Sequence, residues 1–164
     1  KMPWYNNTLF VLCADHATVS YLPDYQTTAG YFSIPILFYF PGGELKGKTD
    51  KIIQQIDIMP SVLSFLHYPK PYFAFGFNAF DNKTDNFAVN NNDGTFNLYH
   101  GDYLLTNDGQ KSTSLFNLKQ DRRNTKNLIN EQPQIKAQLE EKLKAFVQQY
   151  NNQMINNQLT YRKN

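Results

Sequence analysis

Residues 8–16 read Thr-Leu-Phe-Val-Leu-Cys-Ala-Asp-His, and the expectation for the whole chain is built outward from them. The first seven form an apolar run of strand length with no polar alternation, which predicts a strand buried on both faces, as in a parallel sheet. Cys13 is expected inside this strand as a small core residue. The run ends at Asp15 and His16, where we expect the strand to pass into a loop.

The residues that follow extend this strand into an α/β arrangement. A second apolar run, Ile34 to Phe40, is closed by Pro-Gly-Gly at 41–43 and predicts another strand. Residues 57–66 carry the i, i+3, i+4, i+7 apolar spacing of a short buried helix, with Asp57 placed to cap its first turn. Residues 69–80 are rich in aromatic side chains and are expected to form a packed irregular connection.

From residue 86 the pattern becomes that of an antiparallel meander followed by a helix. Asp-Gly pairs at 93–94 and 108–109 predict tight hairpin turns, and a third turn is expected at 100–102. The strands are predicted at about residues 86–90, 95–99, 102–106 and 112–118. Residues 131–156 predict a long amphipathic helix, whose apolar stripe is Ile135, Leu139, Leu143, Phe146, Val147, Tyr150 and Met154. We therefore expect two parts of one structural unit, 1–85 and 86–164.

The composition argues against several classes of protein. The net charge is +2, from 16 Lys and Arg against 14 Asp and Glu, and no basic stripe is visible, so we expect no nucleic-acid partner. A single cysteine excludes an internal disulfide framework and a cysteine-based zinc cluster. No apolar stretch approaches the roughly 20 residues of a membrane span. An aromatic content of 15% argues against wholesale disorder.

Asp15 and His16 are the most informative polar pair. In open α/β sheets, ligands bind beyond the carboxyl ends of the strands, where this pair is expected. A carboxylate oxygen and a neutral imidazole nitrogen suit a divalent metal ion, and neighbouring residues can share one ion only where the strand breaks into a loop. The alternative from the residues alone is that Asp15 caps the following turn and His16 is a partly buried, hydrogen-bonded imidazole.

Two other histidines have weaker claims to a role. His100 lies near Asp102 in a predicted turn, which allows an acid–base pair, although turn capping is the favoured interpretation. His67 follows the short helix and is expected to interact with the helix dipole. Neither histidine is given a catalytic role.

Several segments resemble, in order, the sulfatase/alkaline phosphatase superfamily. Residues 4–16 resemble its block W-x-x-N-T-L-F-V-x-x-A-D-H, most of all in the lipoteichoic acid synthase and phosphoglycerol transferase branch. Residues 55–63 are similar to the family's helix start Q-x-D-I-x-P-T-x-L, and residues 115–128 to its late motif L-Y-D-L-x-x-D…N-L. Residues 33–41 and 71–76 continue the likeness, which covers about residues 3–128.

The resemblance implies a fold and a metal site. The fold would be α/β: the C-terminal portion of an alkaline phosphatase-like mixed sheet with helices, then a small antiparallel meander and a C-terminal amphipathic helix. Asp15 and His16 would bind a divalent metal ion (Mn, Mg, Zn or Ca). In the family the nucleophile, a further acidic ligand and a substrate-binding histidine lie upstream of this block, before Lys1. No catalytic residue is therefore assigned within the chain.

The resemblance also implies a function for the intact protein. We expect a sulfatase-like, metal-dependent enzyme acting on phosphate or sulfate esters, by phosphoglycerol-type transfer or phosphodiester hydrolysis, on a substrate such as a phospholipid or glycan. The alternatives are a sulfuric ester hydrolase and a catalytically silent structural or binding module. The fragment alone is expected to be soluble and inactive without the N-terminal half of its domain. The parent is expected at the bacterial cell membrane, with an extracytoplasmic catalytic domain.

Overall fold

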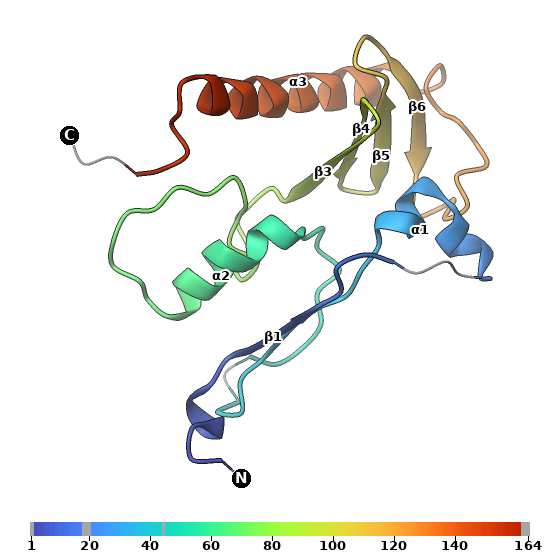
Figure 1. The fold of residues 1–164 in the computed structure, drawn as a ribbon. Helices are drawn as coiled ribbons and strands as arrows, with labels where there is room; N and C mark the ends of the chain where they lie inside the picture. Colours follow the sequence, from blue (N-terminus) through green and yellow to red (C-terminus); the bar gives the residue numbers. More distant parts are fainter. Residues whose placement is uncertain (1, 18–20, 44, 162–164) are drawn as a thin grey trace. The chain divides into compact units, whose positions relative to one another are not determined.

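The computed structural model describes residues 2–17, 21–43 and 45–161, and the chain forms two compact units, 1–51 and 52–164. The fold is mixed α/β, with a two-stranded sheet in the first unit and a four-stranded sheet and a long helix in the second (Figure 1). This confirms the predicted fold class. The division after residue 85 concerns domain organisation and stays a prediction, whereas the compact units divide after Lys51.

The first unit contains a short antiparallel sheet. Strand β1 (Phe10–Cys13) pairs with β2 (Ile36–Tyr39), and Leu12 lies opposite Leu37. The short helix α1 (Thr28–Phe32) lies between the two strands in sequence. Two 3-10 helices complete the unit, η1 (Tyr5–Asn7) and η2 (Pro23–Gln26).

The strands of this sheet are more exposed than predicted. Leu12 and Leu37 each keep 55% of their surface exposed, and Cys13 is exposed with its Sγ donating to the Ala14 carbonyl. The prediction of a parallel strand buried on both faces, with Cys13 in a core, is therefore wrong for this structure. The physical reason is that a two-stranded antiparallel sheet offers too little apolar surface to cover its own faces.

The second unit is built on a four-stranded antiparallel meander. Its strands are β3 (Phe87–Asn92), β4 (Thr95–His100), β5 (Tyr103–Asn107) and β6 (Ser112–Asn117), paired in sequence order. Helix α3 (Pro133–Ile155) lies along one face of the sheet (Figure 1). These elements confirm the predicted meander and helix. The helix begins two residues later than predicted, with Pro133 in its first turn, where proline is tolerated.

The meander depends on turns that need the left-handed backbone region. Asp93 has φ 50° and Gly94 φ 81°, the conformation that a two-residue hairpin of the primed type requires. Gly101 and Gly109 have φ of 56° and 91° in the next two turns. The turn residues read from the sequence are therefore confirmed.

The core of the second unit lies between the sheet and α3. Leu98, Leu105 and Leu115 have no exposed surface, and burying each contributes about 1.5–3 kcal/mol. The remaining buried members of this cluster are Phe87, Leu128, Leu139 and Leu143. The predicted stripe on α3 is confirmed as far as Val147, but Tyr150 and Met154 are 43% and 47% exposed. A helix of 23 residues is about 34 Å long, whereas the strands are about 20 Å long. The end of α3 therefore extends beyond the sheet.

The segment that precedes the meander is held by a buried carboxylate. The 3-10 helix η3 (Gln55–Asp57) leads into α2 (Ile58–Phe65), which confirms the predicted short helix. The Asp57 side chain does not cap α2 as predicted: its Oδ2 accepts from the Gln54 N–H at 2.9 Å and its Oδ1 from the Phe77 N–H at 2.6 Å. Burial raises the pKa of the Asp57 carboxyl, and the two N–H donors partly offset that rise.

The helices of the described residues include none that is both long enough and apolar enough to span a bilayer. In the longest of them, α3, polar side chains occupy much of the circumference outside the apolar stripe.

Candidate metal centre

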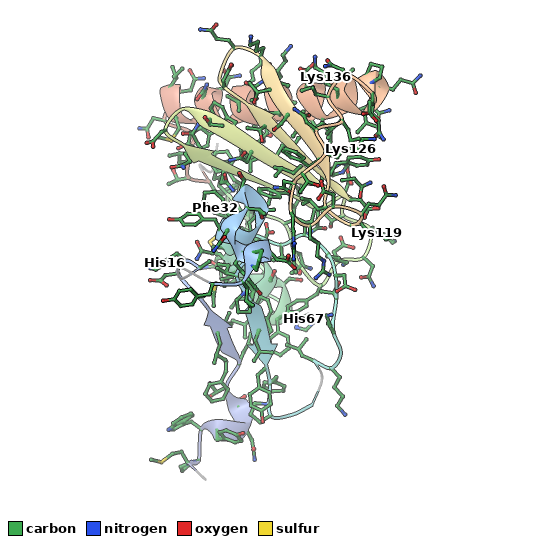
Figure 2. All side chains as sticks on the ribbon, turned by 90° about the vertical axis from the view of Figure 1, so that its right-hand side faces the viewer. His16, Phe32, His67, Lys119, Lys126 and Lys136 are labelled. Carbon is green, nitrogen blue, oxygen red and sulfur yellow. The ribbon has the colours of Figure 1, made fainter. Side chains whose placement is uncertain are left out.

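Asp15 and His16 lie in the bend that follows β1, as predicted (Figure 2). Their side chains are largely exposed, 88% for Asp15 and 73% for His16. The strand ends at Cys13, so the regular alternation of side chains stops before the pair. In a strand, neighbouring side chains point to opposite faces of the sheet. Because Asp15 and His16 lie outside the strand, their side chains can point the same way.

The local hydrogen bonds set the orientation of the imidazole. The Asp15 Oδ1 accepts the backbone N–H of His16 at 2.9 Å, and the His16 Nδ1 lies 2.9 Å from the Ala17 carbonyl oxygen. A carbonyl oxygen can only accept, so Nδ1 carries the proton and Nε2 presents a lone pair. That Nε2 lies 3.6 Å from the Asp15 Oδ2.

This donor pair fits a divalent metal ion. Ligands bound at about 2.1 Å in a tetrahedral arrangement lie about 3.4 Å from one another, close to the observed separation of 3.6 Å. A histidine whose second ring nitrogen donates to a carbonyl is oriented as metal-binding histidines commonly are. The pair offers only two candidate donors, however, and within residues 2–17, 21–43 and 45–161 no group of three His, Cys, Asp or Glu side chains could hold a metal.

The partner of the His100 side chain is Asp85, which was not predicted from the sequence. Its Nε2 lies 2.7 Å from the Asp85 Oδ1, and the Lys142 Nζ lies 2.6 Å from the Asp85 Oδ2. The acid–base pair with Asp102, which the sequence allowed without favouring it, is not found among the described residues, and the Asp102 carboxylate lies 3.9 Å from the Lys119 Nζ. The favoured turn-capping role is not observed either, since the imidazole contacts Asp85. The hydrogen bond from Lys142, and after it that from His100, lowers the pKa of Asp85.

The contact of Asp85 with His100 could have been predicted from the register of the β3–β4 hairpin. The turn at 93–94 pairs Phe87 with His100, which brings the residues just before β3 close to the end of β4.

His67 has φ 50° directly after the C-cap of α2, which confirms its position at the helix end. Its interaction with the helix dipole stays a prediction.

Comparisons with known proteins show what the chain as a whole is similar to. No family model matches the chain. An arylsulfatase of Clostridium perfringens (strain 13 / Type A) is 33% identical over 76 residues, covering 40% of this chain and 15% of that protein. A solved structure described as concerning metabolism of multiple glycosaminoglycans by Bacteroides thetaiotaomicron (BT33336S-sulf) has a TM-score of 0.67 at 17% identity, covering 86% of this chain and 39% of the other.

The two matches together show that the chain is sulfatase-like in fold and, over a limited stretch, in sequence. The structural match shows the fold, and the arylsulfatase match adds a stretch of related sequence. The chain spans well under half the length of each matched protein. The activity of the whole protein is therefore taken up as a proposal.

Proposed function

We propose that this chain is part of a metal-dependent hydrolase of sulfate esters, in which Asp15 and His16 bind the metal ion. The observation that carries the proposal is the contact of the His16 Nδ1 with Ala17, which leaves Nε2 as a lone-pair donor 3.6 Å from the Asp15 Oδ2. The similarity to an arylsulfatase favours sulfate esters as the substrate class.

The chain's own residues would contribute binding and orientation. The Asp15 carboxylate brings negative charge to a divalent ion, and the Ala17 carbonyl keeps the proton of His16 on Nδ1. A bound divalent ion supplies Lewis-acid stabilisation of a developing anion and lowers the pKa of a nucleophile. The nucleophile and the remaining ligands that the resemblance implies are not assigned to any residue of this chain.

Phosphoglycerol transfer is the second candidate function, and one residue favours it. Ala17 follows the Asp-His pair, where many sulfatases carry glycine. In that case the substrate would be a phospholipid-derived phosphodiester, and the parent protein would act at the outer side of the cell membrane. A parent protein that hydrolyses an aryl sulfate but not a phosphodiester would exclude this candidate.

The metal site is tested by substituting each ligand in the parent protein. Asp15→Ala and His16→Ala should each reduce metal content and ester hydrolysis by about 100-fold or more, because loss of an orienting partner alone costs 10–100-fold. His67→Ala is the matched control, since that exposed histidine lies outside the pair and should leave both quantities unchanged. Full metal content in either Asp15 or His16 variant would overturn the assignment.

The isolated 164-residue chain provides a second test. With two ligands and no assigned nucleophile, it should bind Mn²⁺ or Zn²⁺ weakly and turn over neither an aryl sulfate nor a phosphodiester. Turnover by the purified chain that persists through a chelator wash and repeated chromatography would contradict the proposal that this chain by itself does not hold all the residues of the site.

A further inference from the structure

The four-stranded sheet has two edges, with β3 as one edge strand and β6 as the other (Figure 1). An edge strand presents backbone N–H and C=O groups that can pair with a strand of another chain. Lysine, proline and bulges are common means by which an edge resists such pairing. The side chains of β3 and β6 carry no charge, neither strand contains proline, and the β3–β4 register runs without a shift. The β3 edge in particular therefore needs another form of protection.

The register of the β3–β4 hairpin shows which backbone groups of β3 face outward. Its two-residue turn closes on the pair Asn92 and Thr95, and in such a hairpin the closing pair is hydrogen-bonded. Hydrogen-bonded and non-hydrogen-bonded pairs alternate along an antiparallel ladder. The N–H and C=O groups of Phe87, Val89 and Asn91 therefore point away from β4, and these are the groups with which a further strand would pair.

The Gln54 side chain occupies part of this edge. Its Nε2 donates to the Phe87 carbonyl and its Oε1 accepts the Val89 N–H, each at 3.2 Å. In a parallel sheet, one residue of a strand makes the same two bonds with residues i−1 and i+1 of the neighbouring strand. The Gln54 amide thus takes the place of one residue of an added strand, and we call it the β3 cap.

The β3 cap is held in position by contacts at both of its ends. The Gln54 backbone N–H donates to the Asp57 Oδ2 at 2.9 Å, and the Asp57 side chain is fully buried. A backbone carbonyl only accepts and a backbone N–H only donates, so the two bonds to β3 fix which end of the Gln54 amide faces which group. The β3 cap is therefore an ordered part of the fold.

The opposite edge of the sheet has an amide in the same arrangement. The Asn127 Nδ2 donates to the Thr113 carbonyl at 3.1 Å, and its Oδ1 accepts the Leu115 N–H at 3.0 Å. The Leu128 N–H adds a bond to the Leu115 carbonyl at 2.7 Å. The β6 edge is thus covered by both a side chain and the backbone. Two amides remote in sequence make the same pair of bonds, one on each edge strand, which favours edge protection as their shared role.

The two edges differ in what stays open. At Leu115 the β6 edge has a backbone partner in Leu128, whereas no bond to the outward backbone groups of Asn91 is found among the residues that the structure describes. β3 also ends in three asparagines, whose side chains can donate and accept at once. Two copies of this edge can therefore approach antiparallel about a two-fold axis without like-charge repulsion, and every contact then occurs twice.

We infer that the Gln54 amide prevents β3 from pairing with the β3 edge of a second copy of this chain. With the β3 cap in place, an incoming strand has to break two hydrogen bonds before it can make its own, and the unsubstituted chain stays monomeric. Without the cap, the outward groups of Phe87, Val89 and Asn91 form one continuous edge, and the second copy pairs there. The inference concerns the unit 52–164 alone and does not rest on the proposed ester hydrolysis.

Sedimentation equilibrium of the full chain over a range of concentrations tests the role of the β3 cap. Gln54→Ala should dimerise with a dissociation constant at least about tenfold lower than that of any self-association of the unsubstituted chain. Gln54→Met keeps the length of the side chain but not its hydrogen bonds, and it should dimerise as well. Asn127→Ala should change self-association less, because the Leu128 bond remains on β6. Gln149→Ala, at an exposed glutamine of α3, is the control and should behave as the unsubstituted chain does.

Two further variants separate edge protection from a merely stabilising role. Gln54→Glu sets a carboxylate against the Phe87 carbonyl, so it should lower the thermal midpoint. It should nevertheless stay monomeric, because a charge on the edge opposes pairing. Asn92→Lys, combined with Gln54→Ala, should restore the monomer for the same reason. If Gln54→Glu dimerises as strongly as Gln54→Ala, lost stability drives the association and the inference fails.

Hydrogen exchange locates the contact between the two copies. In Gln54→Ala, the amide proton of Asn91 should exchange at least about tenfold more slowly where the dimer predominates than in dilute solution, because the partner strand then accepts it. Two results would overturn the inference. One is that Gln54→Ala and Gln54→Met keep the native circular dichroism spectrum and stay monomeric. The other is a dimer in which exchange at Asn91 does not depend on concentration.

Discussion

Asp57 is fully buried, and both oxygens of its carboxylate accept backbone N–H groups. The neighbouring Ser61 hydroxyl donates to the Asp57 carbonyl at 2.6 Å and accepts the Ala79 N–H at 2.8 Å. These two side chains attach the irregular segment 77–79 to α2. Gly76 permits the close approach, since a Cβ there would lie 2.2 Å from the Ile56 carbonyl oxygen. The residues of segment 55–63 that resemble the family motif thus have a structural role.

Asp57→Asn should destabilise the chain by about 1–3 kcal/mol, even though it removes a buried charge. An amide offers one acceptor oxygen, so its NH₂ group would face the N–H of Gln54 or Phe77, and one buried donor would lose its partner. Urea unfolding at pH 7 measures the difference. Asp93→Asn, in the β3–β4 turn, is the control and should be nearly neutral, because asparagine tolerates that left-handed conformation. An Asp57→Asn variant as stable as the parent would contradict this account.

At the scale of elements, Asp85 links α3 to the end of β4. It accepts from Lys142 of α3 and contacts His100 of β4, and the Lys142 Nζ lies 5.1 Å from the centroid of the Phe87 ring. Because the Asp85 side chain is 70% exposed, solvent screens this ion pair, and we expect it to contribute about 0.2–1 kcal/mol. The link joins the helix to the sheet at a point that the leucine core does not reach.

The interactions of Asp85 predict that the stability difference between the parent chain and an Asp85→Asn variant depends on pH. The folded-state pKa of Asp85 is lowered below 3.8, so its contribution is present above that value and is lost as the pH falls through the folded-state pKa. Asp85→Asn should therefore be less stable than the parent at pH 7, and the gap should close in strongly acidic solution. Unfolding curves of both proteins at matched pH values test this. A gap that widens on acidification would disprove the assigned cause.

The elements differ in how much of them could be predicted from sequence. The hairpin turns were predictable because Asp93 and Gly94 act locally through their own backbone preferences. The exposure of Cys13 could not be predicted from the sequence. An apolar run has the same residues whether or not other elements of the fold cover its strand. The contact between His100 and Asp85 depends on strand register, whereas the residues next to His100 in sequence favoured a turn-capping role.

At the scale of the whole molecule, the two units differ in their cores. The unit 52–164 contains the leucine cluster, whereas Gly30 is the only residue in the described part of 1–51 that is classed as buried. Local stability follows buried apolar contacts, so the unit that carries Asp15 and His16 should open at a lower free-energy cost. The position of Asp15 and His16 just beyond a strand could be predicted from sequence, but whether a third metal-binding side chain joins them depends on tertiary packing, and none does among the described residues.

Hydrogen exchange of the full chain measures this difference directly. Amide protons of β4 and β5 should exchange at least about tenfold more slowly than those of β1 and β2, which corresponds to 1.4 kcal/mol or more. Equal protection in the two sheets would show that the first unit derives its stability from contacts other than a core of its own.

The meander also has a consequence for the order in which the chain folds. Each strand of β3 to β6 pairs with its neighbour in sequence across a short turn, so little loop entropy is lost at each closure and the hairpins should form quickly. Leu139 and Leu143 come from α3, which is synthesised after all four strands. Until that helix is synthesised, the apolar face of a nascent sheet stays in contact with solvent. We expect aggregation during synthesis to be greatest in that interval and to end when α3 packs.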